Sequence, residues 1–260
     1  MVFRPCIDLH AGKVKQIVGS SLTGSDAALV TNFEATMSAE DFAKMYKTDD
    51  LKGGHVIMLG GGCEEAALKA LRAYPQGLQV GGGITPQNAQ KFLEAGASHV
   101  IVTSFLFNGS TLDWARLKEM EITVGKERLV VDLSCRRKAS DGPEGPYYVV
   151  KDKWQTYTDF AITRENVNRL SMHCDEFLVH GVDVEGKQVG IMEDLVTLLG
   201  DISPIPVTYA GGARSIEDLE RVTELGKNKV DLTIGSALDI FGGALSYTDV
   251  VEWDKRNAYI

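Results

Sequence analysis

Two aspartates sit in otherwise apolar runs of the chain. Asp8 lies in the run PCIDL and Asp132 in the run LVVDL, each at the end of a predicted strand. Burying a carboxylate in such a run is costly unless the group is paired or used in chemistry. Two carboxyl groups held over one substrate can act as general acid and general base. The two aspartates are therefore the predicted catalytic pair, and the alternative for either one alone is a structural cap on the next loop.

Two glycine-rich segments, LQVGGGIT (78–85) and VTYAGGAR (207–214), each join an apolar run to a helix-like stretch. Glycine lets a ligand approach backbone N–H groups, and a following helix N-terminus adds partial positive charge. A single turn of this kind is usually an ordinary glycine turn, but the symmetric pair favours phosphate binding. Small residues end the strand-like run after each segment and complete the two sites. The predicted phosphate-binding residues are Gly82, Gly83, Thr103, Ser104, Gly211, Gly212, Gly235 and Ser236.

The same features recur about half a chain apart. Gly82 aligns with Gly211 at an offset of 129 residues, Ser104 with Ser236 at 132, and Asp8 with Asp132 at 124. Three matches in one order, at similar offsets, indicate an internal repeat. The chain is therefore predicted to consist of two (β/α)4 halves, about residues 1–125 and 126–260.

Eight apolar, strand-like runs alternate with amphipathic stretches. This regular alternation predicts one α/β domain over residues 1–260, a (β/α)8 TIM barrel. Neighbouring strands 3 and 4, and 7 and 8, place the phosphate sites on opposite sides of one mouth, with the aspartates of strands 1 and 5 between them. Two phosphate sites at one mouth predict a ligand that carries two phosphates. The predicted strands are 3–9, 55–59, 78–82, 99–103, 128–134, 176–181, 206–211 and 231–236, and the clearest predicted helices are 38–47, 64–74, 85–96 and 215–226.

Composition narrows the class of protein. The net charge of −9 over 260 residues argues against nucleic acid or an anionic membrane as the main partner. The sequence has neither an apolar run of transmembrane length nor a signal-peptide pattern. Four scattered cysteines indicate free thiols and no metal site, so a cytoplasmic location is expected. Residues 19–32 and 136–147 are predicted to be irregular, exposed loops that could lie over the site.

Motifs spread over essentially the whole chain resemble those of the ProFAR isomerase family of histidine biosynthesis. They are IDLHAGKVKQ (7–16), GGGI, VVDL, AGGARS and IGSAL, in that order. The resemblance implies an Amadori rearrangement of a bis-phosphorylated aminoaldose to an aminoketose, without a cofactor or metal. It also implies that Asp132 protonates the ring oxygen and that Asp8 takes the C2 proton. Trp154 falls near a family tryptophan that stacks on the substrate base, the alternative being a packing aromatic.

The sequence departs from the common family pattern in three places. Glycines 60–62 replace a strand-2 Asp-Leu pair, Thr85 stands where arginine is common, and Gly181 replaces a strand-6 threonine. Three residues could supply the lost hydrogen bond, of which His180 is the predicted substrate contact, although a lone histidine at a strand end is more often a core residue. A thiol nucleophile at Cys135 is disfavoured. The three candidates are His180, Asp183 and Glu185.

Rival functions share this barrel. The sister cyclase subunit of imidazole glycerol phosphate synthase needs a glutaminase partner, and its first strand usually runs into Asp-Gly-x-x-Val-Lys, unlike IDLHAGKVKQ here. A non-catalytic phosphosugar-binding barrel would not need both aspartates. A bifunctional isomerase that also accepts the tryptophan-pathway analogue stays open. The expected protein is a monomer without an obligate protein partner.

Overall fold

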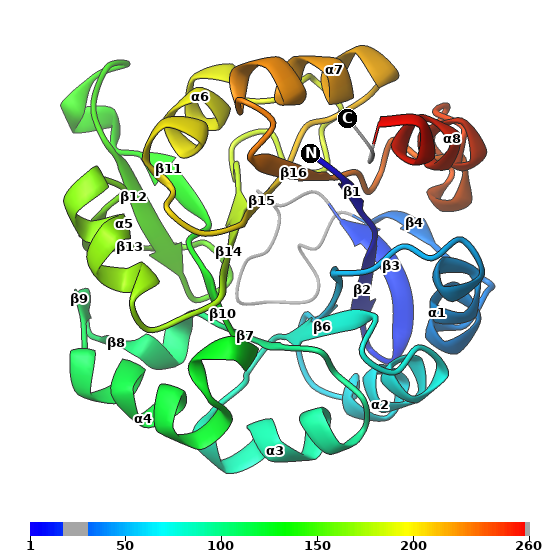
Figure 1. Ribbon diagram of the computed structural model, residues 1–260, viewed down its shortest axis with the longest axis horizontal. Coiled ribbons are helices and arrows are strands. Elements are labelled where there is room, and N and C mark those ends of the chain that lie inside the picture. The colour runs from blue at the N-terminus through cyan, green and yellow to red at the C-terminus, as the bar shows by residue number, and fades with distance from the viewer. Residues whose placement is uncertain (18–30, 258–260) are drawn as a thin grey trace.

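Parallel strands form a closed ring in the computed structural model, which describes residues 1–17 and 31–257 (Figure 1). The ring closes through the first segment of the chain, because β1 pairs with β16 and β2 pairs with β5, with only Pro5 between β1 and β2. This confirms the predicted (β/α)8 barrel. In ring order the strands are β1 (Phe3–Arg4) with β2 (Cys6–His10), β5 (Gly54–Met58), β6 (Leu78–Gly81), β7 (Val100–Val102), β10 (Leu129–Asp132), β14 (Glu176–His180), β15 (Val207–Ala210) and β16 (Val230–Thr233).

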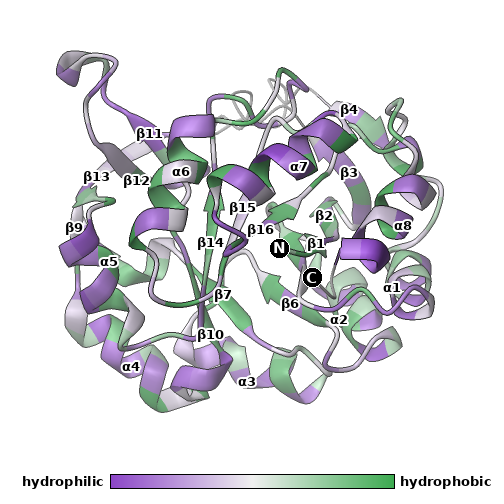
Figure 2. Ribbon diagram, turned by 45° about the horizontal axis from the view of Figure 1, so that its top comes forward, coloured by the Kyte–Doolittle hydropathy of each residue, from purple (hydrophilic) through white to green (hydrophobic). Residues whose placement is uncertain are grey.

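Helices surround this ring on the outside, and their polar faces point away from the strands (Figures 1 and 2). The four predicted helices are present within two residues of their expected ends. None of the helices in the described part of the chain is long and apolar enough to cross a lipid bilayer. The helices are α1 (Ala39–Thr48), α2 (Glu64–Ala73), α3 (Pro86–Glu94), α4 (Trp114–Val124), α5 (Arg164–Ser171), α6 (Glu193–Ile202), α7 (Ile216–Leu225) and α8 (Tyr247–Asn257).

Local signals explain where these helices begin. Ser38 precedes α1, and its Oγ accepts a hydrogen bond from the Asp41 amide at 3.2 Å. Thr85 precedes α3, and its amide donates to Asn88 Oδ1 at 2.9 Å, while Pro86 occupies the first helical position. Such caps satisfy amides that have no partner within the helix. Thr85 therefore caps α3, two residues after Gly83 in the glycine-rich segment that follows β6.

Apolar side chains fill the barrel interior next to its mouth. Ile57, Ile101, Val130 and Leu178 pack together as an apolar cluster separate from the large core between strands and helices. Layers of this kind make a TIM barrel a packed core and leave the carboxyl ends of the strands for a site.

Two predicted loops need correction. The segment 136–147 is not wholly irregular, because Arg136 and Arg137 lie in β11 (Cys135–Arg137) and Tyr147 begins β12 (Tyr147–Lys151). These strands and β13 (Thr156–Ala161) form an antiparallel sheet beside the barrel. The Arg137 guanidinium fixes this sheet, since it donates to the Gly145 carbonyl at 2.8 Å and pairs with Asp194 at 2.5 Å.

The other predicted loop, 19–32, lies almost entirely outside the described residues. Its last two residues, Thr31 and Asn32, belong to β4 (Thr31–Glu34), which pairs antiparallel with β3 (Lys13–Ile17), so they are not irregular. A short hairpin of β8 (Phe107–Asn108) and β9 (Thr111–Leu112) follows β7.

Candidate active site

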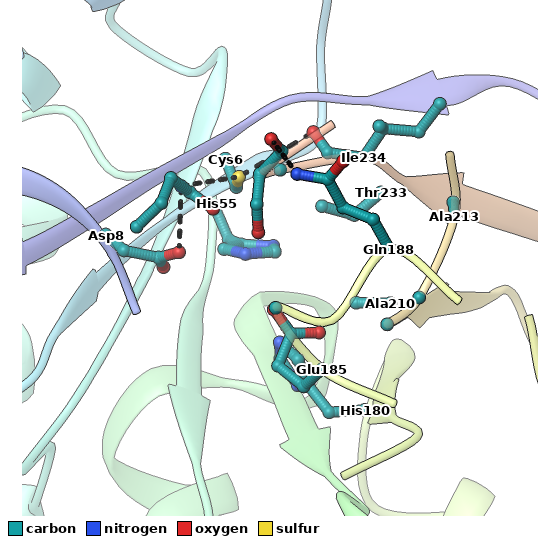
Figure 3. A pocket seen from close by; sticks show the side chains of 16 residues that line it. Cys6, Asp8, His55, His180, Glu185, Gln188, Ala210, Ala213, Thr233 and Ile234 are labelled. Carbon is teal, nitrogen blue, oxygen red and sulfur yellow. Dashed lines mark hydrogen bonds between the residues drawn. The ribbon is translucent and has the colours of Figure 1, made fainter. Parts of the chain in front are cut away.

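Two adjoining cavities open where the barrel strands end. The three side chains of Asp8, His180 and Glu185 line both of them. The structure thus places all twelve predicted site residues around one mouth. The larger cavity is also lined by Gly82, Gly83, Thr103, Ser104, Asp132 and Trp154, and the smaller, drawn in Figure 3, by Gly211, Gly212, Gly235 and Ser236.

Asp8 is the third of the five residues of β2, and Gln16 of β3 reaches it. Gln16 Nε2 donates to Asp8 Oδ2 at 3.3 Å. Burial raises the pKa of Asp8 to about 7, and this hydrogen bond opposes the rise. A carboxyl group that titrates near neutral pH can accept a proton from carbon and release it again, as a general base must.

Asp132 ends β10 and is held by the residue two positions further on. Both the amide and the hydroxyl of Ser134 donate to Asp132 Oδ1, at 2.7 and 2.6 Å. The Ser134 hydroxyl also lies 3.0 Å from His180 Nδ1. Asp132 is therefore fixed in orientation and linked through Ser134 to a histidine of the neighbouring strand β14.

Three aromatic rings meet at the wall between the cavities. The His180 ring centroid lies 5.4 Å from that of Trp154 and 5.9 Å from that of His55. Burial lowers the pKa of His180, although the charge of Asp132 acts against this. Burial, followed by the neighbouring His180, lowers the pKa of His55 to about 3. Both imidazoles are consequently neutral at pH 7.

Two of the predicted phosphate-binding glycines have no room for a side chain. Gly82 has φ +94°, and a methyl group there would lie 2.1 Å from the Met58 carbonyl oxygen. Gly212 has φ +78°, and a methyl group there would lie 2.1 Å from the Gly190 carbonyl oxygen. Helices α3 and α7 begin four residues after these glycines, so their N-termini lie close to each predicted phosphate site.

The three candidates for the missing strand-6 hydrogen bond have different surroundings. Asp183 pairs with Arg136 at 2.7 Å. Glu185 lines both cavities, and burial followed by the charge of Asp8 raises its pKa to about 8. His180 lines both cavities and contacts Ser134, so it and Glu185 are the two that a ligand could reach.

A thiol nucleophile has no support in the structure. The Cys135 side chain is fully buried, and burial followed by the charge of Asp132 raises its pKa well above the ordinary value. A protonated, inaccessible thiol is a poor nucleophile.

Sequence reasoning missed three residues that shape the site. Gln16 contacts Asp8, Ser134 contacts Asp132, and His55 packs against His180. The available signal was a polar residue on a strand or soon after it, as Gln16 is in KVKQI, Ser134 in VDLS and His55 in GHVIM.

Comparison with known proteins places the chain in a family. Residues 3–245 match the model of the family described as histidine biosynthesis protein. A chloroplastic protein from Medicago truncatula is 57% identical over 98% of this chain and 82% of its own length. Proteins from Yarrowia lipolytica and Saccharomyces cerevisiae are 52% and 44% identical, each over 98% of both chains. All three relatives are named 1-(5-phosphoribosyl)-5-((5-phosphoribosylamino)methylideneamino)imidazole-4-carboxamide isomerase.

The family match and the alignment with the Yarrowia relative each cover nearly the whole chain. The chain belongs to the histidine biosynthesis protein family.

Proposed function

We propose that this chain isomerises the bis-phosphorylated aminoaldose named in its relatives to the corresponding aminoketose, with Asp8 and Asp132 as the acid–base pair. The chain is an isomerase of histidine biosynthesis, as its relatives at 44–57% identity are. The observation that carries the residue roles is the arrangement of the mouth. Both aspartates line one cavity, with a glycine-rich phosphate site on either side.

The chemistry assigns one proton transfer to each aspartate. Asp132 protonates the ribose ring oxygen, so the ring opens, and Asp8 removes the proton from C2. The pKa of Asp8 near 7 suits the base role at neutral pH. The two glycine-rich sites hold the terminal phosphates, and Trp154 stacks on the imidazole carboxamide between them. The half-barrel repeat accounts for the two similar phosphate sites.

The rival functions lack comparable support. The relatives are named isomerases and not cyclases, and both aspartates line the mouth, which a mere binding barrel would not require. We expect no obligate protein partner for the activity, in line with relatives such as the Yarrowia protein, of which this chain covers 98%. A single-domain monomer in the cytoplasm is the expected form, although the Medicago relative is named chloroplastic. Sedimentation of the purified protein tests the monomer.

The test is a spectroscopic turnover assay with the aminoaldose substrate, without ammonia or a glutaminase. Wild-type protein is expected to form the aminoketose. Asp8→Asn and Asp132→Asn are each expected to lower kcat by about 100-fold or more while the circular dichroism spectrum stays unchanged. Turnover of the ketose on addition of ammonia, without any isomerisation, would instead indicate the cyclase.

A further inference from the structure

The side chains of Asp132, Ser134 and His180 form one continuous chain of hydrogen bonds. Ser134 Oγ lies 2.6 Å from Asp132 Oδ1 and 3.0 Å from His180 Nδ1. Ser134 is completely buried and His180 is 9% exposed, so bulk water does not separate these groups. With Nδ1 occupied by Ser134, Nε2 is the ring nitrogen that His180 can present to the cavities that it lines.

The number of polar hydrogens on Asp132, Ser134 and His180 determines which group donates at each of the two contacts. A serine hydroxyl has one hydrogen to donate. When Asp132 is ionised, Ser134 donates to it, and His180 Nδ1–H must donate to Ser134, which leaves a lone pair on Nε2. When Asp132 is protonated and donates to Ser134, the serine donates to Nδ1, and Nε2 carries the hydrogen. The same heavy-atom positions satisfy both states.

After the two aspartates have acted, the rearrangement still requires two changes: the enol must lose a proton and Asp132 must regain one. Asp8 takes a proton from C2 and can return it to C1, so Asp8 ends as it began. Asp132 gives a proton to the ring oxygen and ends ionised. Meanwhile the C2 hydroxyl of the enol must lose its proton when the ketone forms. One group therefore needs a proton, and another must release one, within the same closed site.

We propose that His180 and Ser134 carry this proton from the C2 hydroxyl of the enol to Asp132. The O–H bond at C2 breaks as an N–H bond forms at His180 Nε2. The Nδ1–H proton moves to Ser134 Oγ, and the serine proton moves to the Asp132 carboxylate. Every proton is accounted for when the acid proton of Asp132 starts on Oδ2, because Oδ1 then accepts from Ser134 and His180 begins with its hydrogen on Nδ1. Exchange with water after product release restores that starting tautomer.

Two surroundings of His180 suit this role. Burial lowers its pKa, so the ring is neutral and Nε2 can accept a proton. The rings of Trp154 and His55 pack against it and hold its plane. His180 is thus a further catalytic residue, and Ser134 positions it and transmits the proton. This proposal rests on the acid role of Asp132 proposed above.

Ser134→Ala interrupts the chain of hydrogen bonds but leaves Asp132 and His180 in place. We expect kcat to fall by about 100-fold with KM nearly unchanged, and Ser134→Thr, which keeps a hydroxyl, to recover most of the loss. The matched control is Ser171→Ala, since Ser171 is also a buried serine but donates to the Asn168 carbonyl on α5. That control should leave kcat unchanged.

A second measurement uses the wild-type protein alone. Single-turnover rates are followed in mixtures of H₂O and D₂O. Several protons moving together give a curved dependence of rate on deuterium fraction, and one proton gives a straight line. A straight line, or a Ser134→Ala variant as active as Ser171→Ala, overturns the relay. Wild-type protein without turnover, or an active Asp132→Asn variant, contradicts the proposed function instead, so the two failures are distinguishable.

Discussion

Asp8 and Glu185 line the same two cavities, where burial and then the charge of Asp8 raise the pKa of Glu185 to about 8. Glu185 also lies beside a predicted phosphate site, because a methyl group on Gly211 would be 3.3 Å from Glu185 Oε2. Near neutral pH, Asp8 is the carboxyl group that ionises first, and Glu185 stays protonated next to it. Because Glu185 is still protonated when Asp8 is ionised, no carboxylate charge from Glu185 lies beside the phosphates of the proposed substrate.

Substrate affinity is therefore expected to depend on Glu185 at alkaline pH. As Glu185 ionises above about pH 8, its charge repels a phosphate, and KM should rise. Glu185→Gln cannot ionise, so its KM should stay flat from pH 7 to 9. Steady-state kinetics across this range provide the measurement. Equal alkaline increases of KM in both proteins would contradict this interpretation. At lower pH both proteins should gain kcat/KM through about pH 7, as Asp8 becomes a free base.

Asp8 should also reduce the stability of the fold at the pH where it is active. Its pKa is about 7 in the folded protein and 3.8 for an ordinary aspartate, so the folded state binds this proton more tightly. The stability that the folded state gains from binding this proton is fully present below pH 3.8 and is lost as the pH rises towards 7. Asp8→Asn avoids that loss, and its Tm at pH 8 should exceed that of the wild type by about 3 °C.

Two comparisons test this prediction by differential scanning calorimetry. The stabilisation of Asp8→Asn should be smaller at pH 5 than at pH 8, since wild-type Asp8 is then mostly protonated. Asp201→Asn provides a control of opposite sign, because an exposed hydrogen bond from Lys227 lowers the pKa of Asp201. That variant should not gain stability at pH 8. If Asp8→Asn were no more stable than wild type at pH 8, the buried charge would not be costly.

The adjacent glycines Gly82 and Gly83 of the proposed phosphate site should respond differently to the same substitution. Gly82→Ala places a methyl group 2.1 Å from the Met58 carbonyl oxygen, so the backbone must move, and we expect a loss of about 3 kcal/mol in unfolding free energy. Gly83 has φ +73° and no atom within 4 Å of such a methyl group. Gly83→Ala should cost only about 1 kcal/mol of backbone strain but raise KM about tenfold, because the methyl group takes space meant for phosphate. Urea unfolding and KM measurements separate the two, and a stable Gly82→Ala variant would argue against the close approach.

The barrel strands could be predicted because parallel strands covered on both faces are almost continuously apolar. HVIML and EFLVHG, for example, appear as β5 and β14 with ends shifted by no more than one residue. The catalytic candidates could be predicted because a lone aspartate interrupts such a run. The partners Gln16, Ser134 and His55 could not, since each is a common polar residue whose meaning depends on a side chain from another strand or turn. The sheet of β11, β12 and β13 was missed because glycines, two prolines and charges dominate the segment between its first two strands.

Trp154 is held in the cavity by an unusual backbone. Asp152, Lys153 and Trp154 have φ of 54°, 56° and 64°, three successive non-glycine residues in the left-handed region. Each costs about 1 kcal/mol relative to glycine, and such strain is retained where it fixes a functional group. The Asp152 amide donates to Ser104 Oγ at 3.3 Å, which ties this turn to the proposed phosphate site of Gly82, Gly83, Thr103 and Ser104.

Lys153→Gly should relieve part of that strain, and Lys153→Ala is its matched control. Both variants remove the same charge and side chain, but only glycine adopts φ near +56° without cost. The glycine variant should be about 1 kcal/mol more stable than the alanine variant in urea unfolding. It should nevertheless bind substrate more weakly, with a higher KM, because a relaxed turn no longer presents Trp154 in one position. Equal stability of the two variants would show that the left-handed turn stores no strain, and a higher stability with unchanged KM would show that the strain does not serve Trp154.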